Sequence, residues 1–202
     1  MTITVEDHAT PDLQAMMSRL RRRKPLMQAM GKAVEVELHR HFTKRDGEGN
    51  KHGWPSRHFW NRTVRKATAY QGATDDEATV SIASKEFIHK LHGGPITASG
   101  GKYLAIPLTA RAYQVGRPKL WPGGKSALTL IKTAKACVLI EAYHSSLGKR
   151  QRGKIRGGEA QYLLVKRVNQ KADPRALPTE SKLQGAAMIT ARNFLSRAFP
   201  IA

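Results

Sequence analysis

Hydrophobic residues recur at helical spacing near both ends of the chain. A short stretch over 11–20 is followed by a longer one, in which Pro25 suits the first turn and the apolar positions continue to Phe42. That apolar face comprises Leu26, Met30, Ala33, Val34, Leu38 and Phe42. Ser56 can cap a third helix that runs to about Tyr70. A closing helix is predicted over 181–198, with Leu183, Ala187, Ile189, Phe194 and Leu195 facing inward.

The middle of the chain changes to the period of a strand. Residues 78–83 alternate with period two, and further strands are predicted at 102–107, 127–132, 136–142 and 160–165. Glycine and proline between them indicate β-hairpin connections. Helices, then antiparallel strands, then a helix predict an α+β fold with a central, mainly antiparallel sheet. We expect a basic helical arm over 1–24 and a single domain over 25–202, with long loops at 43–56 and 144–158.

The net charge of the chain indicates what kind of partner to expect. The chain holds 35 lysines and arginines against 15 acidic residues, a formal charge of +20. Such a field attracts polyanions, so nucleic acid or an acidic protein surface is the expected neighbour. A single cysteine, Cys137, excludes an internal disulfide and a multi-cysteine metal site. No apolar run has the length of a membrane span, and acidic Glu6 and Asp7 replace the basic start of a signal peptide, which favours the cytoplasm.

Two groups of basic residues are candidates for contact with DNA phosphates or with a partner. The first lies on the flank of the predicted third helix: Arg57, Arg62, Arg65 and Lys66. The second lies in a glycine-rich segment that contains no acid and resembles a hairpin tip: Lys149, Arg150, Arg152, Lys154 and Arg156. Five such cations would make binding depend on salt and little on base sequence, although a solvated loop that aids solubility explains the second group equally well.

Histidines and acids do not form a recognisable catalytic pattern. No pair has the spacing of a zinc hydrolase, and the acids near them, Glu35, Glu37 and Glu86, are interpreted as surface charges. A metal-dependent nuclease needs convergent carboxylates, which are scarce in this chain. We therefore expect no catalytic residues, no metal and no cofactor.

The segment Phe87-Ile-His-Lys-Leu-His-Gly-Gly-Pro-Ile-Thr97 carries the main motif. After a glycine turn comes Gly101-Lys-Tyr-Leu-Ala-Ile-Pro-Leu-Thr109, and a loop near residue 50 contains Trp54 and Pro55. This order resembles the tailed-phage virion-morphogenesis proteins, which include tail-completion and head-to-tail joining components. The residues that match the family pattern are Trp54, Pro55, Phe87, His89, Gly93, Gly94, Lys102, Leu104, Ala105, Ile106 and Pro107.

The resemblance implies a structural role in the virion. It suggests a small α+β subunit in the tail or neck that assembles in the host cytoplasm into a ring, commonly a hexamer. The implied partners are further copies of itself and other junction proteins, such as the connector, the tail tube or the terminator, with DNA passing through the lumen. Long loops and exposed strand edges would suit such head-to-tail interfaces.

Two other functions remain open on the sequence. A free, sequence-independent DNA-binding protein would explain the charge equally well but not the Gly-Gly motif, and no helix-turn-helix or zinc finger is visible. A nuclease is opposed by the shortage of acids.

Overall fold

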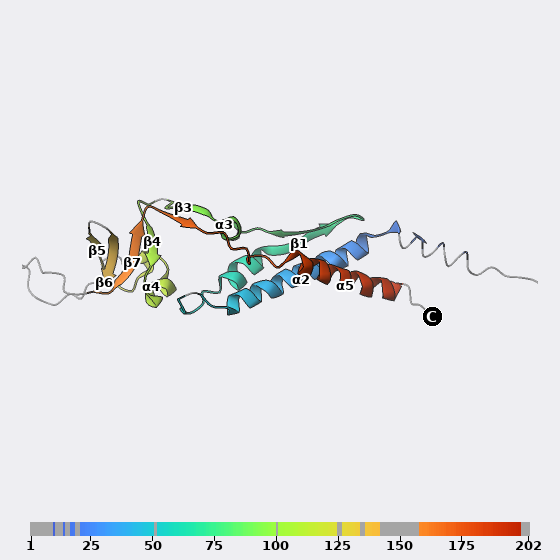
Figure 1. Ribbon diagram of the computed structural model, residues 1–202, viewed down its shortest axis with the longest axis horizontal. Helices are drawn as coiled ribbons and strands as arrows, with labels where there is room; N and C mark the ends of the chain where they lie inside the picture. The colour runs from blue at the N-terminus through green and yellow to red at the C-terminus, as the bar shows by residue number, and fades with distance from the viewer. Residues whose placement is uncertain are drawn as a thin grey trace, which may run out of the picture. The chain divides into compact units, whose positions relative to one another are not determined.

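The computed structural model describes residues 21–50, 52–99, 101–124, 127–133, 136–141 and 158–198, together with residues 10, 14, 17 and 18. Helices and antiparallel sheets make up the described chain, which confirms the α+β class (Figure 1). Most of the predicted helix over 11–20 and nearly all of the loop 144–158 lie outside the described residues.

The described chain divides into two compact units. The first joins residues of 1–48, 58–91 and 174–202, and the second joins 49–57 and 92–173. The predicted single domain over 25–202 stays a prediction. Each unit has its own buried cluster of hydrophobic side chains.

Unit 1 is built around the long helix α2 (Lys24–Gly47). Pro25 lies in its first turn, as predicted, but the helix continues through 43–47, where a loop was expected. The polar residues of this last turn stay helical because Asp46 faces inward, with 8% of its surface exposed, and bonds to the segment that follows. The loop prediction for 43–56 is therefore wrong over its first five residues.

The predicted third helix is much shorter than expected. Phe59 begins a helical segment that consists of a π turn, η1 (Trp60–Val64), and a 3-10 turn, η2 (Arg65–Ala67). Ser56 does not start it, because His58 has a left-handed backbone (φ +55) that a helix cannot contain. The last predicted residues, 68–70, belong to strand β1 (Thr68–Ala73), which pairs with β2 (Ala78–Ile82).

Helix α2 lies beside both the β1–β2 pair and the closing helix α5 (Glu180–Ala198) (Figure 1). The short helix α3 (Lys85–His92) adds Phe87 to the core, next to Leu38, Phe42, Trp60, Val64 and Ala176. The Phe42 ring stacks on Trp60 at 6.0 Å between centroids and meets Phe87 edge to face at 5.9 Å. The inward prediction is wrong for Ile189 and Leu195 of α5, which are exposed.

Unit 2 contains two antiparallel sheets. A four-stranded sheet has the order β4-β7-β6-β5, and a two-stranded sheet pairs β3 with β8. The strands are β3 (Gly94–Thr97), β4 (Leu104–Pro107), β5 (Leu128–Lys132), β6 (Cys137–Glu141), β7 (Ala160–Val165) and β8 (Arg167–Gln170). Helix α4 (Ala110–Val115) and the 3-10 turn η3 (Pro118–Leu120) connect β4 to β5, and neither was predicted.

Strands β3 and β4 do not pair with each other across the glycine turn between them. Strand β3 pairs with β8, about 70 residues later in the chain, while β4 pairs with β7. Gly93 makes the first pairing possible, because a Cβ there would lie 2.6 Å from both the Ala172 nitrogen and the Gln170 oxygen. Its backbone is also left-handed (φ +69). The Gly-Gly motif therefore serves a long-range strand pair.

Candidate functional site

The first basic group is divided between the two units. Arg62, Arg65 and Lys66 lie on the η1–η2 segment of unit 1 with exposed side chains, and none of them makes an ion pair within the described residues. Arg57 belongs to unit 2, where its guanidinium lies 5.8 Å from the Tyr113 ring centroid and packs on Gly116. The prediction that all four residues share one helix flank is therefore wrong for Arg57.

A buried carboxylate positions the η1–η2 segment. Asp46 Oδ1 accepts a hydrogen bond from the Trp60 backbone nitrogen at 3.2 Å. Its Oδ2 accepts from Asn61 Nδ2 at 3.2 Å and lies 2.7 Å from His58 Nδ1. Asp46 thus satisfies the first donors of the segment that carries Arg62, Arg65 and Lys66. Sequence reasoning missed this role, and the only available signal was an acid at the end of a helical pattern.

The second basic group cannot be placed. Lys149, Arg150, Arg152, Lys154 and Arg156 lie outside the described residues, so their predicted role as a basic hairpin tip stays a prediction.

The loop carrying Trp54 and Pro55 is attached to helix α4. The Trp54 ring lies 4.6 Å from that of His52 and 5.3 Å from that of Tyr113. Gln114 Nε2 donates to the Pro55 carbonyl oxygen at 2.9 Å. Asn50 closes the loop, since its side chain bonds to the Trp54 carbonyl oxygen and to the His52 and Trp54 nitrogens. These motif residues therefore fix the chain entering unit 2.

The other motif residues have different structural settings. Phe87 is 4% exposed in the core of unit 1, whereas His89 points outward on α3. Gly94 has a left-handed backbone (φ +124), and Lys102 is exposed. The four residues of the Leu-Ala-Ile-Pro motif form strand β4: Leu104, Ala105, Ile106 and Pro107.

Two further histidines and a glutamate bind backbone rather than a metal. His41 Nε2 lies 3.1 Å from the Arg175 carbonyl oxygen. His39 Nε2 lies 3.3 Å from the Thr68 oxygen, and Glu35 Oε1 accepts from the Tyr70 nitrogen at 3.1 Å. Glu35 is thus not the free surface charge expected from the sequence. Within the described ranges, no three His, Cys, Asp or Glu side chains are grouped as a metal site would require.

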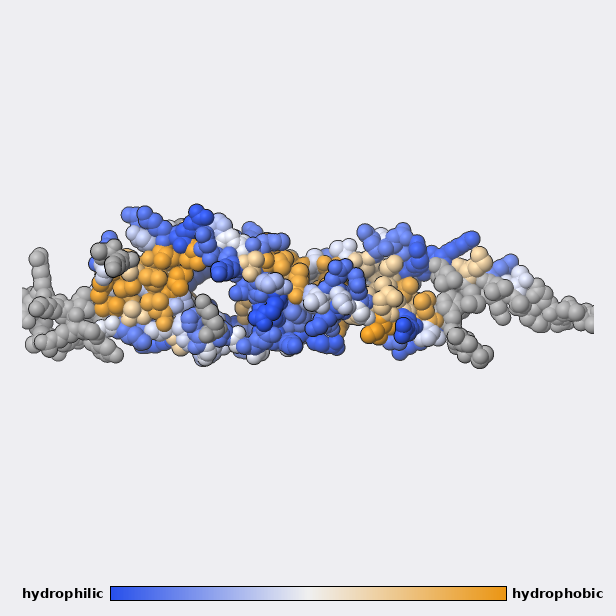
Figure 2. All heavy atoms as spheres, viewed as in Figure 1, coloured by the Kyte–Doolittle hydropathy of each residue, from blue (hydrophilic) through white to orange (hydrophobic). Residues whose placement is uncertain are grey.

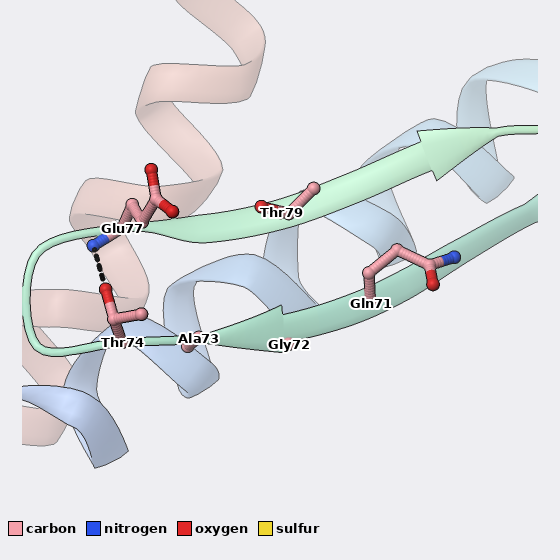
Figure 3. Close-up of a pocket in the computed structure, with 6 residues that line it drawn as sticks. All are labelled: Gln71, Gly72, Ala73, Thr74, Glu77 and Thr79. Atoms are coloured by element: carbon pink, nitrogen blue, oxygen red, sulfur yellow. Dashed lines mark hydrogen bonds between the residues drawn. The ribbon is translucent and has the colours of Figure 1, made fainter.

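The hollow at the tip of the β1–β2 pair offers little chemistry. Figure 3 shows Gln71, Gly72, Ala73, Thr74, Glu77 and Thr79 around it. The Glu77 nitrogen donates to Thr74 Oγ1 at 3.2 Å, which stabilises the turn. Glu77 is its one ionisable side chain. We interpret the hollow as part of the turn.

Free strand edges are the more informative feature of the described surface. Thr133 N–H donates to the Ala136 oxygen at 2.8 Å and closes the β5–β6 turn. Because N–H directions alternate in an antiparallel pair, those of Thr129 and Ile131 point toward β6, and the main-chain groups of Leu128, Leu130 and Lys132 point away from it. Within the described residues, strand β5 thus ends its sheet with three N–H groups that no other strand accepts, and it contains no proline.

Other edges are blocked in part. On β1, the Glu35 and His39 side chains of α2 take up the outer groups of Tyr70 and Thr68. On β4, Leu108 N–H donates to the Gln161 oxygen, so the outward positions are Ala105 and Pro107, and proline has no N–H. Strand β5 is therefore better suited than β1 or β4 to pair with another chain.

Comparison with protein-family models, with curated proteins and with solved structures found no match. None of the helices in the described part of the chain has the length and apolar character of a membrane span.

Proposed function

We propose that this protein is a structural subunit of a tailed-phage particle, at the junction of head and tail, and that its copies join into a ring. The resemblance of the motif residues suggests this role, and the open edge of β5 is the observation that supports it best. Ring building needs head-to-tail contacts, in which one surface meets a different surface of the next copy. An unpaired strand supplies main-chain hydrogen bonds for such a contact.

The settings of the motif residues agree with a role in shape rather than in catalysis. Trp54 and Pro55 attach the entry loop to α4, Gly93 allows the β3–β8 pair, and Ala105 and Pro107 lie on the outer edge of β4. Gly93 is required by the close approach of the backbone at its position, and Pro107 removes an N–H group from the edge of β4.

Sequence-independent DNA binding is the second candidate. It is favoured by Arg62, Arg65 and Lys66, which are exposed and make no ion pair within the described residues. Three phosphate contacts would give a salt-dependent affinity that falls roughly 2.7 powers of ten for each tenfold rise in salt.

The two candidates can be separated by measuring the mass of the full chain in solution by light scattering, at low and high salt, with and without duplex DNA. We expect a ring-sized oligomer that persists at high salt. Leu130→Pro should dissociate it, since proline removes the outward N–H, while Leu130→Ala keeps that N–H and should leave the ring intact. A monomer that coats DNA and is released as salt rises, and whose affinity drops when Arg62, Arg65 and Lys66 become glutamine, would replace the ring proposal with the second candidate.

A further inference from the structure

The two faces of the four-stranded sheet are covered differently. One face carries Leu128, Leu139 and Tyr162, which pack with Ala112 of α4 and with Trp121 into the core of unit 2. Side chains alternate across a sheet, so the strand register assigns the remaining positions to the opposite face. We call this opposite set the open face. It consists of Leu104, Ile106, Thr129, Ile131, Val138, Ile140, Leu163 and Val165.

The open face is apolar and remains partly exposed. Seven of its eight residues are leucine, isoleucine or valine, and all except Ile140, which is 5% exposed, are only partly buried. None of them belongs to the buried core cluster of unit 2 or packs against it, whereas that cluster includes α4 and Trp121 from the other side. Figure 2 shows hydrophobic residues gathered over this sheet. A sheet face of this composition is normally covered by a helix or a second sheet.

One end of the open face is basic. Leu104 and Val165 are cross-strand partners at its edge, and Lys102 and Arg167 lie two residues beyond them. Lys132 ends strand β5 at the same end of the sheet, but it lies on the core face, together with Leu128 and Leu130. The sequence ranges of unit 2 contain only three acids, Glu141, Glu159 and Asp173. Of these, Glu141 lies opposite Leu128 at the far end of the sheet, where it pairs with Arg111.

A second copy of the chain fits this face poorly. Four strands about 4.8 Å apart and five residues long, at about 3.3 Å per residue, present roughly 300 Å². Any occupant of this face, a helix included, would bury roughly 600 Å² in total, which is the size of a small, transient interface rather than of a stable one. Two copies would bring like charges together, since each chain carries +20.

We propose that the open face binds an acidic amphipathic helix of a partner protein, with apolar side chains on the sheet and carboxylates at Lys102 and Arg167. The basic end favours a partner with negative charge, and the apolar side chains of the sheet favour a helix with an apolar stripe. This surface differs from the β5 edge and does not depend on the ring proposal. Binding could therefore succeed or fail while the ring is unaffected.

The test uses labelled 18-residue peptides and the full chain, with fluorescence anisotropy as the readout. The probe has leucine at helical spacing and glutamate elsewhere. One control replaces each glutamate by lysine, and the other replaces each leucine by serine. We expect the leucine–glutamate probe to bind at least tenfold more tightly than either control. Equal binding of the two glutamate peptides would mean attraction to net charge alone and would overturn the proposal.

Variants locate the binding surface. Ile106→Asn and, separately, the nearly isosteric Val138→Thr should weaken probe binding at least fivefold while leaving the melting temperature unchanged, because both side chains face outward. Ile189→Asn, at an exposed apolar position of α5, is the matched control and should bind normally. Lys102→Glu should weaken binding at low salt.

Two results would assign the open face to another occupant. A concentration-dependent dimer that both face variants abolish would mean a second copy. A lack of probe binding, together with melting temperatures that both face variants lower, would mean that the chain covers this face itself. Either result would overturn the proposal.

Discussion

The two units use charge in opposite ways. In unit 1, basic side chains form ion pairs with acidic ones: Arg40 pairs with Glu37 at 3.0 Å, Arg23 with Asp76, and Arg45 with Glu48. The sequence of unit 2 contains seventeen lysines and arginines but only three acidic residues. Most of the +20 charge therefore belongs to unit 2. The charges of unit 1 therefore support its fold, whereas the excess of basic residues in unit 2 is available to a partner.

The two units also differ in how completely their hydrophobic residues are covered. The core of unit 1 draws on α2, α3, η1 and the segment before α5, so its aromatic rings are enclosed by several elements. The core of unit 2 lies on one face of a sheet and leaves the opposite face apolar. Unit 1 thus resembles a closed scaffold, and unit 2 resembles a half of an interface.

The largest expected effect tests whether acids support unit 1 more than unit 2. Asp46→Asn keeps the shape of the side chain but removes the charge that accepts from Trp60, Asn61 and His58. Loss of hydrogen bonds to a buried charge should lower the free energy of unfolding by about 2 kcal/mol. Hydrogen exchange followed by mass spectrometry should show faster exchange in α2 and η1.

The matched control is Glu141→Gln in unit 2. Glu141 pairs with Arg111 at 2.7 Å, but the Arg111 side chain is 53% exposed. Exposed ion pairs contribute about 0–1 kcal/mol, so exchange in β6 should barely change. If Asp46→Asn and Glu141→Gln lowered the free energy of unfolding equally, the proposed contrast between the units would be wrong.

A smaller effect concerns the close packing of unit 1. A Cβ on Gly31 would lie 2.8 Å from the Tyr70 ring and from the Ala78 Cβ, so the β1–β2 pair must shift to accept it. Gly31→Ala should therefore destabilise unit 1 by about 1 kcal/mol, although alanine favours a helix by about the same amount. Gly47, in the same helix, has open space around it and is the control. Gly47→Ala should be neutral or slightly stabilising in denaturant unfolding; a stabilising Gly31→Ala would contradict the packing argument.

Local patterns predicted much of the fold. Helices α2 and α5 and strands β2, β5, β6 and β7 follow from periods that the sequence displays. Strand β1 was missed because the predicted third helix extended to about Tyr70, whereas the pairing of Tyr70 with Val80 makes this segment a strand. Strand β8 was missed because its partner β3 lies about 70 residues earlier.

The candidate surfaces were predicted less completely. Exposure of Arg62, Arg65 and Lys66 follows from their place beside an apolar stripe. The position of Arg57 does not, because it depends on Tyr113 and Gly116, more than 50 residues away. The open face also requires the register of four strands, which no single segment specifies.

The smallest effect tests the closed side of unit 2. Tyr162 is fully buried, and its hydroxyl donates to the Ala112 oxygen at 3.2 Å. Burial raises the pKa of Tyr162 above its usual value of 10.0, and the positive charge of Arg57 opposes this by a smaller amount. The stability linked to the neutral phenol is therefore fully present below pH 10 and is lost as the pH rises through the folded-state pKa.

Absorbance at 295 nm should accordingly show one tyrosine that ionises after the others, and Tyr162→Phe should remove that step. Arg57→Gln removes the charge that favours the phenolate, so it should raise the pKa of Tyr162 further. Arg111→Gln is the control, since Arg111 stacks on Trp121 beside Tyr162 but is not a cause of the shift. A lower Tyr162 pKa in Arg57→Gln would mean that Arg57 acts through packing on Tyr113 rather than through its charge.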